Sequence, residues 1–71
     1  YQPDICDADV EFLGLNRPED AYILTIVTLR NGQATTNLKG PIVINRNTLI
    51  GKQVIPNNAA QFEVRHPLAV S

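Results

Sequence analysis

Hydrophobic and polar positions near the start of the chain follow the pattern of a short helix. Cys6 stands at an N-cap position, and Asp9 lies in the first turn, where a carboxylate is favoured by the helix dipole. Gly14 follows as a left-handed stop, and Leu15 is placed to pack back onto the last turn. The pattern predicts a helix over residues 7–13.

The period then changes to that of β-strands. Residues 21–29 are rich in β-branched side chains and apolar on both faces, which favours a central strand covered on two sides. Asn31-Gly32 follows, a strong signal for a two-residue hairpin turn that pairs Thr28 with Thr35. Further strands are predicted over residues 33–38, 42–45, 49–55 and 62–66.

Glycine and proline set the limits of these strands. Gly40-Pro41 separates the second strand from the third, since proline cannot donate to a central ladder. Gly51 is a candidate bulge, and Pro67 ends the last strand. The expected fold is mainly β: an antiparallel meander with one short helix near the N-terminus.

Length places the chain among marginal folding units. At 71 residues, the apolar surface buried on folding and the entropy cost of ordering are of similar size. The sequence contains no Met and opens on Tyr1, so we expect a fragment or a processed chain. Sheet edges left exposed in such a fragment would invite pairing with another copy.

Charge and composition remove several classes of protein. Six basic and seven acidic side chains lack the basic stripe of a dedicated nucleic-acid binder. The longest apolar stretch, residues 22–29, is too short to cross a bilayer. A single Cys excludes an internal disulfide framework and fits a reducing cytoplasm.

No catalytic or metal-binding constellation emerges from the sequence. The sequence has a single Ser, at its last position, which argues against a serine triad. One Cys and one His cannot supply the four nitrogen and sulfur ligands of a zinc site. Asp7, Asp9 and Glu11 have the spacing of a calcium loop, but Phe12 stands where that loop requires glycine. We therefore expect neither enzymatic activity nor a cofactor.

Three separate sequence motifs, in the same order along the chain, resemble the flagellar assembly factor FliW family. They are Thr36-Asn-Leu-Lys-Gly-Pro-Ile-Val-Ile-Asn45, Gly51-Lys-Gln-Val-Ile55 and Val64-Arg-His-Pro-Leu68. The acidic helix and the turn at Arg17-Pro-Glu-Asp20 are also similar to that family. Because members of the family are longer, the resemblance implies that residues 1–71 form one domain fragment, the C-terminal half of a small β-barrel.

The resemblance implies a cytoplasmic binding protein of flagellar assembly. Such proteins sequester the translational regulator CsrA and bind flagellin, which couples flagellin translation to assembly. Neither catalysis, a cofactor, direct nucleic-acid binding nor membrane contact is implied. Two alternatives remain open: a structural β subdomain cut from a larger enzyme, and a nucleic-acid-binding barrel.

Candidate partner-binding residues are the polar members of the matched motifs, of which a subset would form or support a partner surface. They are Asn37, Lys39, Asn45, Lys52, Gln53, Arg65 and His66. A rival surface is acidic and would meet a basic regulator through charge complementarity; it comprises Asp7, Asp9, Glu11, Glu19 and Asp20. The tight hairpin Arg30-Asn-Gly-Gln33 departs from relatives, which often carry a longer loop there.

Overall fold

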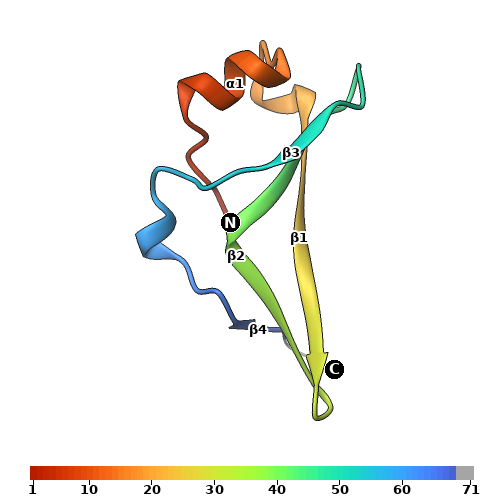
Figure 1. The fold of residues 1–71 in the computed structure, drawn as a ribbon, viewed down its shortest axis with the longest axis vertical. Helices are drawn as coiled ribbons and strands as arrows, with labels where there is room; N and C mark the ends of the chain where they lie inside the picture. Colours follow the sequence, from red (N-terminus) through yellow and green to blue (C-terminus); the bar gives the residue numbers. More distant parts are fainter. Residues whose placement is uncertain (69–71) are drawn as a thin grey trace.

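The computed structural model describes residues 1–68 as one short helix and a four-stranded antiparallel sheet (Figure 1). The helix α1 spans Asp7–Leu13. The strands are β1 (Ala21–Arg30), β2 (Gln33–Asn45), β3 (Gly51–Gln53) and β4 (His66–Pro67), and single 3₁₀ turns form η1 (Pro18–Asp20) and η2 (Ala59–Gln61). The predicted mainly-β class, with its short N-terminal helix, is confirmed. The sheet is open within these residues, so closure into a barrel stays a prediction.

The helix has the predicted bounds and the predicted stop. Gly14 adopts the left-handed conformation with a φ of 67°, and its N–H donates to the Glu11 carbonyl at 3.1 Å. The Leu15 N–H donates to the Val10 carbonyl at 3.1 Å, so the last turn is closed. Cys6 occupies the N-cap position without capping a backbone N–H. Its thiol instead donates to Asp9 Oδ2 at 3.2 Å.

Strand β2, not β1, is the centre of the sheet. β1 pairs with one edge of β2, whereas β3 and β4 pair with β2 away from β1, at opposite ends of its length. The prediction of a doubly covered strand over residues 21–29 is therefore wrong: Val27 is 55% exposed and Leu29 75%. A run of β-branched apolar residues favours a β-strand but does not specify which elements cover its faces. Within residues 1–68 the single helix lies near only one end of β1, so most of the strand is left uncovered (Figure 1).

A bend in β2 replaces the predicted break at Gly40-Pro41. Leu24 pairs with Ile42 and Ile26 with Asn37, so residues 38–41 fall opposite the single residue Thr25. The backbone groups released there bond elsewhere: the Leu38 N–H donates to the Glu63 carbonyl, at 3.0 Å. Proline is tolerated at the bend because no ladder donor is needed there. The two strands predicted over 33–38 and 42–45 are thus one strand in two straight segments.

The hairpin between β1 and β2 has the predicted register. Thr28 lies opposite Thr35, and Arg30 opposite Gln33. Asn31 and Gly32 both have positive φ, 53° and 77°, as a two-residue turn of this kind requires. Local turn chemistry therefore determines which hairpin side chains share a face.

Strand β3, predicted over residues 49–55, spans only Gly51–Gln53, and Gly51 is not a bulge. Leu49 turns the chain with a φ of 61°, so pairing begins at Gly51, which lies in regular register opposite Ile44. A Cβ at position 51 would stand 2.8 Å from Ile44 Cγ1. Glycine is needed here for close approach of two strands, not for an extra residue.

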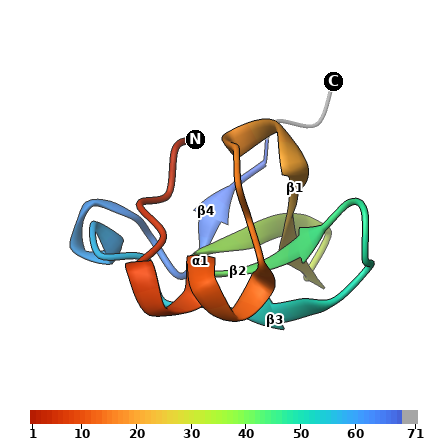
Figure 2. The ribbon, with the colours of Figure 1, turned by 90° about the horizontal axis from the view of Figure 1, so that it is seen from above.

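The predicted strand over 62–66 is also wrong. Residues 62–65 form a bend and a turn, in which the Phe62 ring packs edge-on against Tyr1 with ring centroids 4.9 Å apart. Of the predicted stretch, only His66 belongs to a strand, β4, which pairs with β2. The segment between β3 and β4, coloured blue, loops to the side of the sheet away from β1 in both views (Figures 1 and 2). Alternating apolar and polar residues encode an anchored turn as readily as a short strand.

The hydrophobic core is small and lies at the helix end of the molecule. Leu13, Val43 and Val54 are buried, and Ile5, Leu15 and Ala21 pack against them. Figure 2 shows α1 crossing in front of β2 at this end, seen from above. The hairpin end lies outside this core.

Asn45 joins the helix, the sheet and the following turn. Its buried Nδ2 donates to the Leu13 carbonyl at 2.8 Å, which satisfies an unpaired group at the helix end. Its Oδ1 accepts from the Asn47 and Thr48 N–H groups, at 2.8 and 3.2 Å. One side chain thus holds three backbone segments in place.

Substituting Asn45→Ala is expected to lower the free energy of unfolding by about 1–3 kcal/mol, because buried backbone groups lose their partners. Urea denaturation measures the change. Asn47→Ala, at an exposed position two residues later, is the matched control and is expected to stay within about 0.5 kcal/mol of the parent chain. Equal effects of the two substitutions would contradict this role for Asn45.

Candidate partner-binding site

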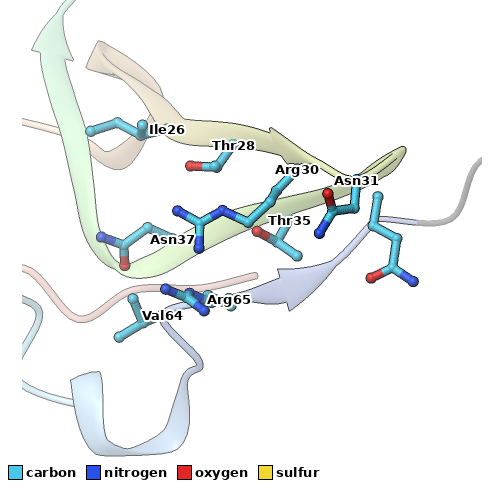
Figure 3. A pocket seen from close by; sticks show the side chains of 9 residues that line it. Ile26, Thr28, Arg30, Asn31, Thr35, Asn37, Val64 and Arg65 are labelled. Carbon is cyan, nitrogen blue, oxygen red and sulfur yellow. The ribbon is translucent and has the colours of Figure 1, made fainter.

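A pocket of about 340 Å³ lies on one face of the β1–β2 hairpin (Figure 3). We name it the hairpin pocket. Its lining comes from both strands, from the turn between them and from the segment before β4: Ile26, Thr28, Arg30, Asn31, Gln33, Thr35, Asn37, Val64 and Arg65. Its volume falls at the small end of the range of small-molecule sites.

Strand alternation explains why the floor of the pocket is polar. The cross-strand pairs Thr28–Thr35 and Arg30–Gln33 are two residues apart along each strand, so they share one face. The intervening Val27 and Leu29 belong to the opposite, apolar face. The bend in β2 leaves Asn37 as the last paired residue of the hairpin, at the inner end of the floor.

One wall of the pocket is the turn that carries Val64 and Arg65. Two features hold this turn beside β2: the bond from the Leu38 N–H to the Glu63 carbonyl, and the pairing of His66 with Thr36. In Figure 3 the Arg30 side chain extends back along the strands toward Asn37, and Arg65 faces the same space. The tertiary fold therefore brings together two arginines that are far apart in sequence.

The hairpin pocket is cationic. Its lining contains two guanidinium groups and no carboxylate. In the part of the chain that the structure describes, the two ion pairs are Lys52–Asp9 and His66–Glu63, and neither includes Arg30 or Arg65. Two guanidinium groups that face one cavity and form no ion pair within residues 1–68 suit a carboxylate or phosphate, which they can bind through paired hydrogen bonds.

The chemistry of the lining is that of binding. Hydroxyl, amide and guanidinium groups can donate hydrogen bonds, but the lining holds no His, Cys or carboxylate to serve as a general base. Across residues 1–68, no group of three or more His, Cys, Asp and Glu side chains is placed to hold a metal ion. Over the same residues, no helix is long and apolar enough to cross a membrane.

Two of the seven predicted site residues, Asn37 and Arg65, line the hairpin pocket. Lys39 lies beside it, where its backbone N–H donates to Asn37 Oδ1 at 2.9 Å and holds that side chain. His66 follows Arg65 and is exposed, with its Nδ1 3.3 Å from Glu63 Oε1. The fold thus places four predicted residues in the lining of the hairpin pocket or next to it in the chain.

The other three predicted residues hold the structure together elsewhere. Asn45 is the buried junction described above. Gln53 Nε2 donates to the Gly40 carbonyl at 2.9 Å and fastens β3 to the bend of β2. Lys52 reaches α1, with its Nζ 2.7 Å from Asp9 Oδ1 and 5.2 Å from the centre of the Phe12 ring. These positions suit support of a surface better than direct contact.

The predicted acidic surface is reduced by the fold. Asp20 is buried and Asp9 is paired with Lys52, which leaves Asp7, Glu11 and Glu19 exposed. The hydrogen bond from Lys52, and secondarily that from the Cys6 thiol, hold the pKa of Asp9 below its ordinary value. The paired carboxylate is therefore part of the contact between helix and sheet.

Sequence reasoning missed Arg30, Thr28 and Thr35 as site residues. A usable signal was present, because the predicted hairpin register already placed Thr28 opposite Thr35 and Arg30 opposite Gln33. What the sequence lacked was any sign that the turn carrying Arg65 would lie against that face.

Fold and pocket together define a small, mainly β module suited to binding an anionic group. Residues 1–68 match the family model described as FliW protein, and the chain belongs to this family, as its motifs predict. The relatives from Clostridium novyi (strain NT) and Natranaerobius thermophilus are each 37% identical to it over 96% of this chain. The relative from Bacillus subtilis (strain 168) is 29% identical, also over 96% of this chain.

All three relatives are named flagellar assembly factor FliW. The alignments cover 48%, 46% and 48% of their respective lengths. The chain therefore spans about half the length of the curated relatives it matches.

The Asp9–Lys52 pair predicts a pH dependence of stability. Because the pKa of Asp9 is lowered in the folded chain, its contribution is present above the ordinary value of 3.8 and is lost as pH falls through the folded pKa. The melting temperature of Asp9→Asn should lie below that of the parent chain at pH 7. The difference should close as the pH falls below 3.8 and through the lowered pKa of Asp9 in the folded chain.

Thermal melting followed by circular dichroism between these pH values measures the difference. Glu11→Gln, which removes an exposed charge from the same helix without touching Lys52, controls for net charge. A difference for Asp9→Asn that persists unchanged in acid would rule out the ion pair as its cause.

Proposed function

We propose that this chain acts in flagellum assembly as the protein-binding, non-catalytic C-terminal half of a FliW-type factor. The observation that carries the proposal is the family match over residues 1–68, together with relatives that are named flagellar assembly factors. The hairpin pocket supports a binding role, since its lining can hold an anionic group but offers no general base.

The proposed partners are the translational regulator CsrA and flagellin, bound in the cytoplasm. Exchange between the two would couple flagellin translation to assembly: flagellin that awaits export occupies the factor and releases CsrA. The near-neutral charge of the chain supports protein partners over RNA, because a polynucleotide requires a basic track that six Lys and Arg against seven Asp and Glu do not supply.

The proposed architecture is a small β-barrel that further strands complete. Within residues 1–68 the outer edge of β1 has no strand beside it. The apolar side chains there are exposed, among them Ile26 at 45%, Val27 at 55% and Leu29 at 75%. Monomeric proteins rarely leave such a strand uncovered. Strands that cover the Val27 and Leu29 face would leave the hairpin pocket, on the opposite face, open to a partner.

Isothermal titration calorimetry of the complete protein with purified CsrA and with flagellin tests the proposed partners. Each is expected to bind, and saturation with flagellin is expected to reduce CsrA binding. The translation-coupling role requires that exchange, so simultaneous and independent binding of both partners would contradict it. Absence of binding to both would refute the proposed function as a whole.

The proposed architecture predicts that residues 1–71 expressed alone self-associate through β1. Light scattering coupled to size-exclusion chromatography measures the assembly. Val27→Lys is expected to reduce association, because a charge on the uncovered apolar face opposes burial. Thr28→Lys, which adds the same charge on the pocket face of the same strand, is the matched control. A monomeric parent chain that unfolds cooperatively would contradict this prediction.

A further inference from the structure

We infer that the hairpin pocket binds an acidic segment of a protein partner, with Arg30 and Arg65 holding its carboxylates. The inference rests on the proposed function, because it specifies which partner chemistry the protein-binding role uses. It assigns a recognition role to two residues from separate parts of the chain, Arg30 at the end of β1 and Arg65 in the turn before β4, which share one cavity.

The first observation that supports the inference is the absence of an acidic partner for Arg30 and Arg65 within residues 1–68. Both line the pocket, yet neither takes part in the ion pairs formed within residues 1–68. Two other cations are engaged elsewhere: Lys52 is paired with Asp9, and the Arg46 guanidinium lies 5.6 Å from the Tyr22 ring centre. Like charges around one cavity repel, and an anion in the cavity removes that repulsion.

The neutral groups of the lining fit a carboxylate. Thr28 and Thr35 face each other across the ladder on the pocket floor, and each hydroxyl can donate a hydrogen bond to an acceptor oxygen. Asn37 is held in place by the Lys39 N–H at its Oδ1, so its Nδ2 donors remain for a ligand. The pocket therefore offers three kinds of donor group, hydroxyl, amide and guanidinium, around one volume.

The size and charge of the site favour an acidic peptide over a nucleic acid. A polynucleotide presents a regular line of phosphates and needs a track of cations, whereas this pocket has two. Two guanidinium groups match two neighbouring acidic side chains of one segment. Ile26 and Val64 add apolar surface that a peptide side chain between them can cover.

A peptide titration of the complete ¹⁵N-labelled protein tests the inference by NMR. The probe is a capped heptapeptide with two glutamates separated by a valine; a second peptide carries glutamines in their place. The acidic peptide is expected to shift the backbone amides of Thr28, Thr35 and Asn37, and the glutamine peptide is not. Equal shifts with both peptides would overturn the inference.

The double variant Arg30→Ala/Arg65→Ala is expected to bind the acidic peptide about tenfold more weakly, since charged hydrogen bonds are lost. Arg17→Ala/Arg46→Ala removes the same charge outside the pocket and is expected to leave affinity unchanged. Arg30 and Arg65 are exposed and form no ion pair within residues 1–68, so Arg30→Ala/Arg65→Ala should keep the parent melting temperature. Equal losses of affinity in the two variants would show that net charge causes the effect, and would overturn the assignment of the site.

Two further outcomes separate this inference from the proposed function. If CsrA or flagellin binds Arg30→Ala/Arg65→Ala as tightly as the parent, the pocket is not its docking site, while the proposed function stands. If the acidic peptide binds but neither protein does, the proposed function fails and the acidic-segment site is supported. A single-stranded RNA oligonucleotide that shifts the same amides at lower concentration than the peptide would overturn the assignment to a protein partner.

Discussion

The fold depends on the bend of β2, where residues 38–41 leave the β1 ladder and must find other hydrogen-bond partners. Buried backbone groups are costly when unpaired, so segments distant in sequence are drawn to this point. The Glu63 carbonyl accepts from Leu38, and Pro41 accepts from Val54. Gln53 reaches the Gly40 carbonyl. The bend thereby fixes where both β3 and the turn before β4 lie.

The same bend divides the molecule into two parts with different tasks. On one side, β2 packs its buried Val43 against α1 and carries Asn45, which locks the helix end. On the other side, the hairpin extends past the small core and presents a polar, cationic face. The buried core is therefore concentrated at the helix end, and the proposed recognition surface lies at the hairpin end.

Much of the fold could be predicted wherever local chemistry decides the outcome. The helix stop at Gly14 and the hairpin register at Asn31-Gly32 depend on left-handed backbone and turn geometry, which neighbouring residues determine. The central placement of residues 21–29 and the strand over 62–66 were wrong. Periodicity indicates which residues are apolar but cannot indicate which element covers them. Of the site, Asn37 and Arg65 could be found from motifs, whereas Arg30 could be found only from the predicted hairpin register.

By itself, the sequence determined the mainly-β class, the helix bounds, the hairpin and the family, because these depend on local turn chemistry and on motif order. Only the tertiary structure decided that β2 is central and that Lys52 and Asn45 hold the helix. It alone placed Arg65 beside the hairpin face that carries Arg30. Those outcomes depend on hydrogen bonds between residues far apart in the sequence, formed around the bend of β2. Local sequence patterns cannot predict such bonds.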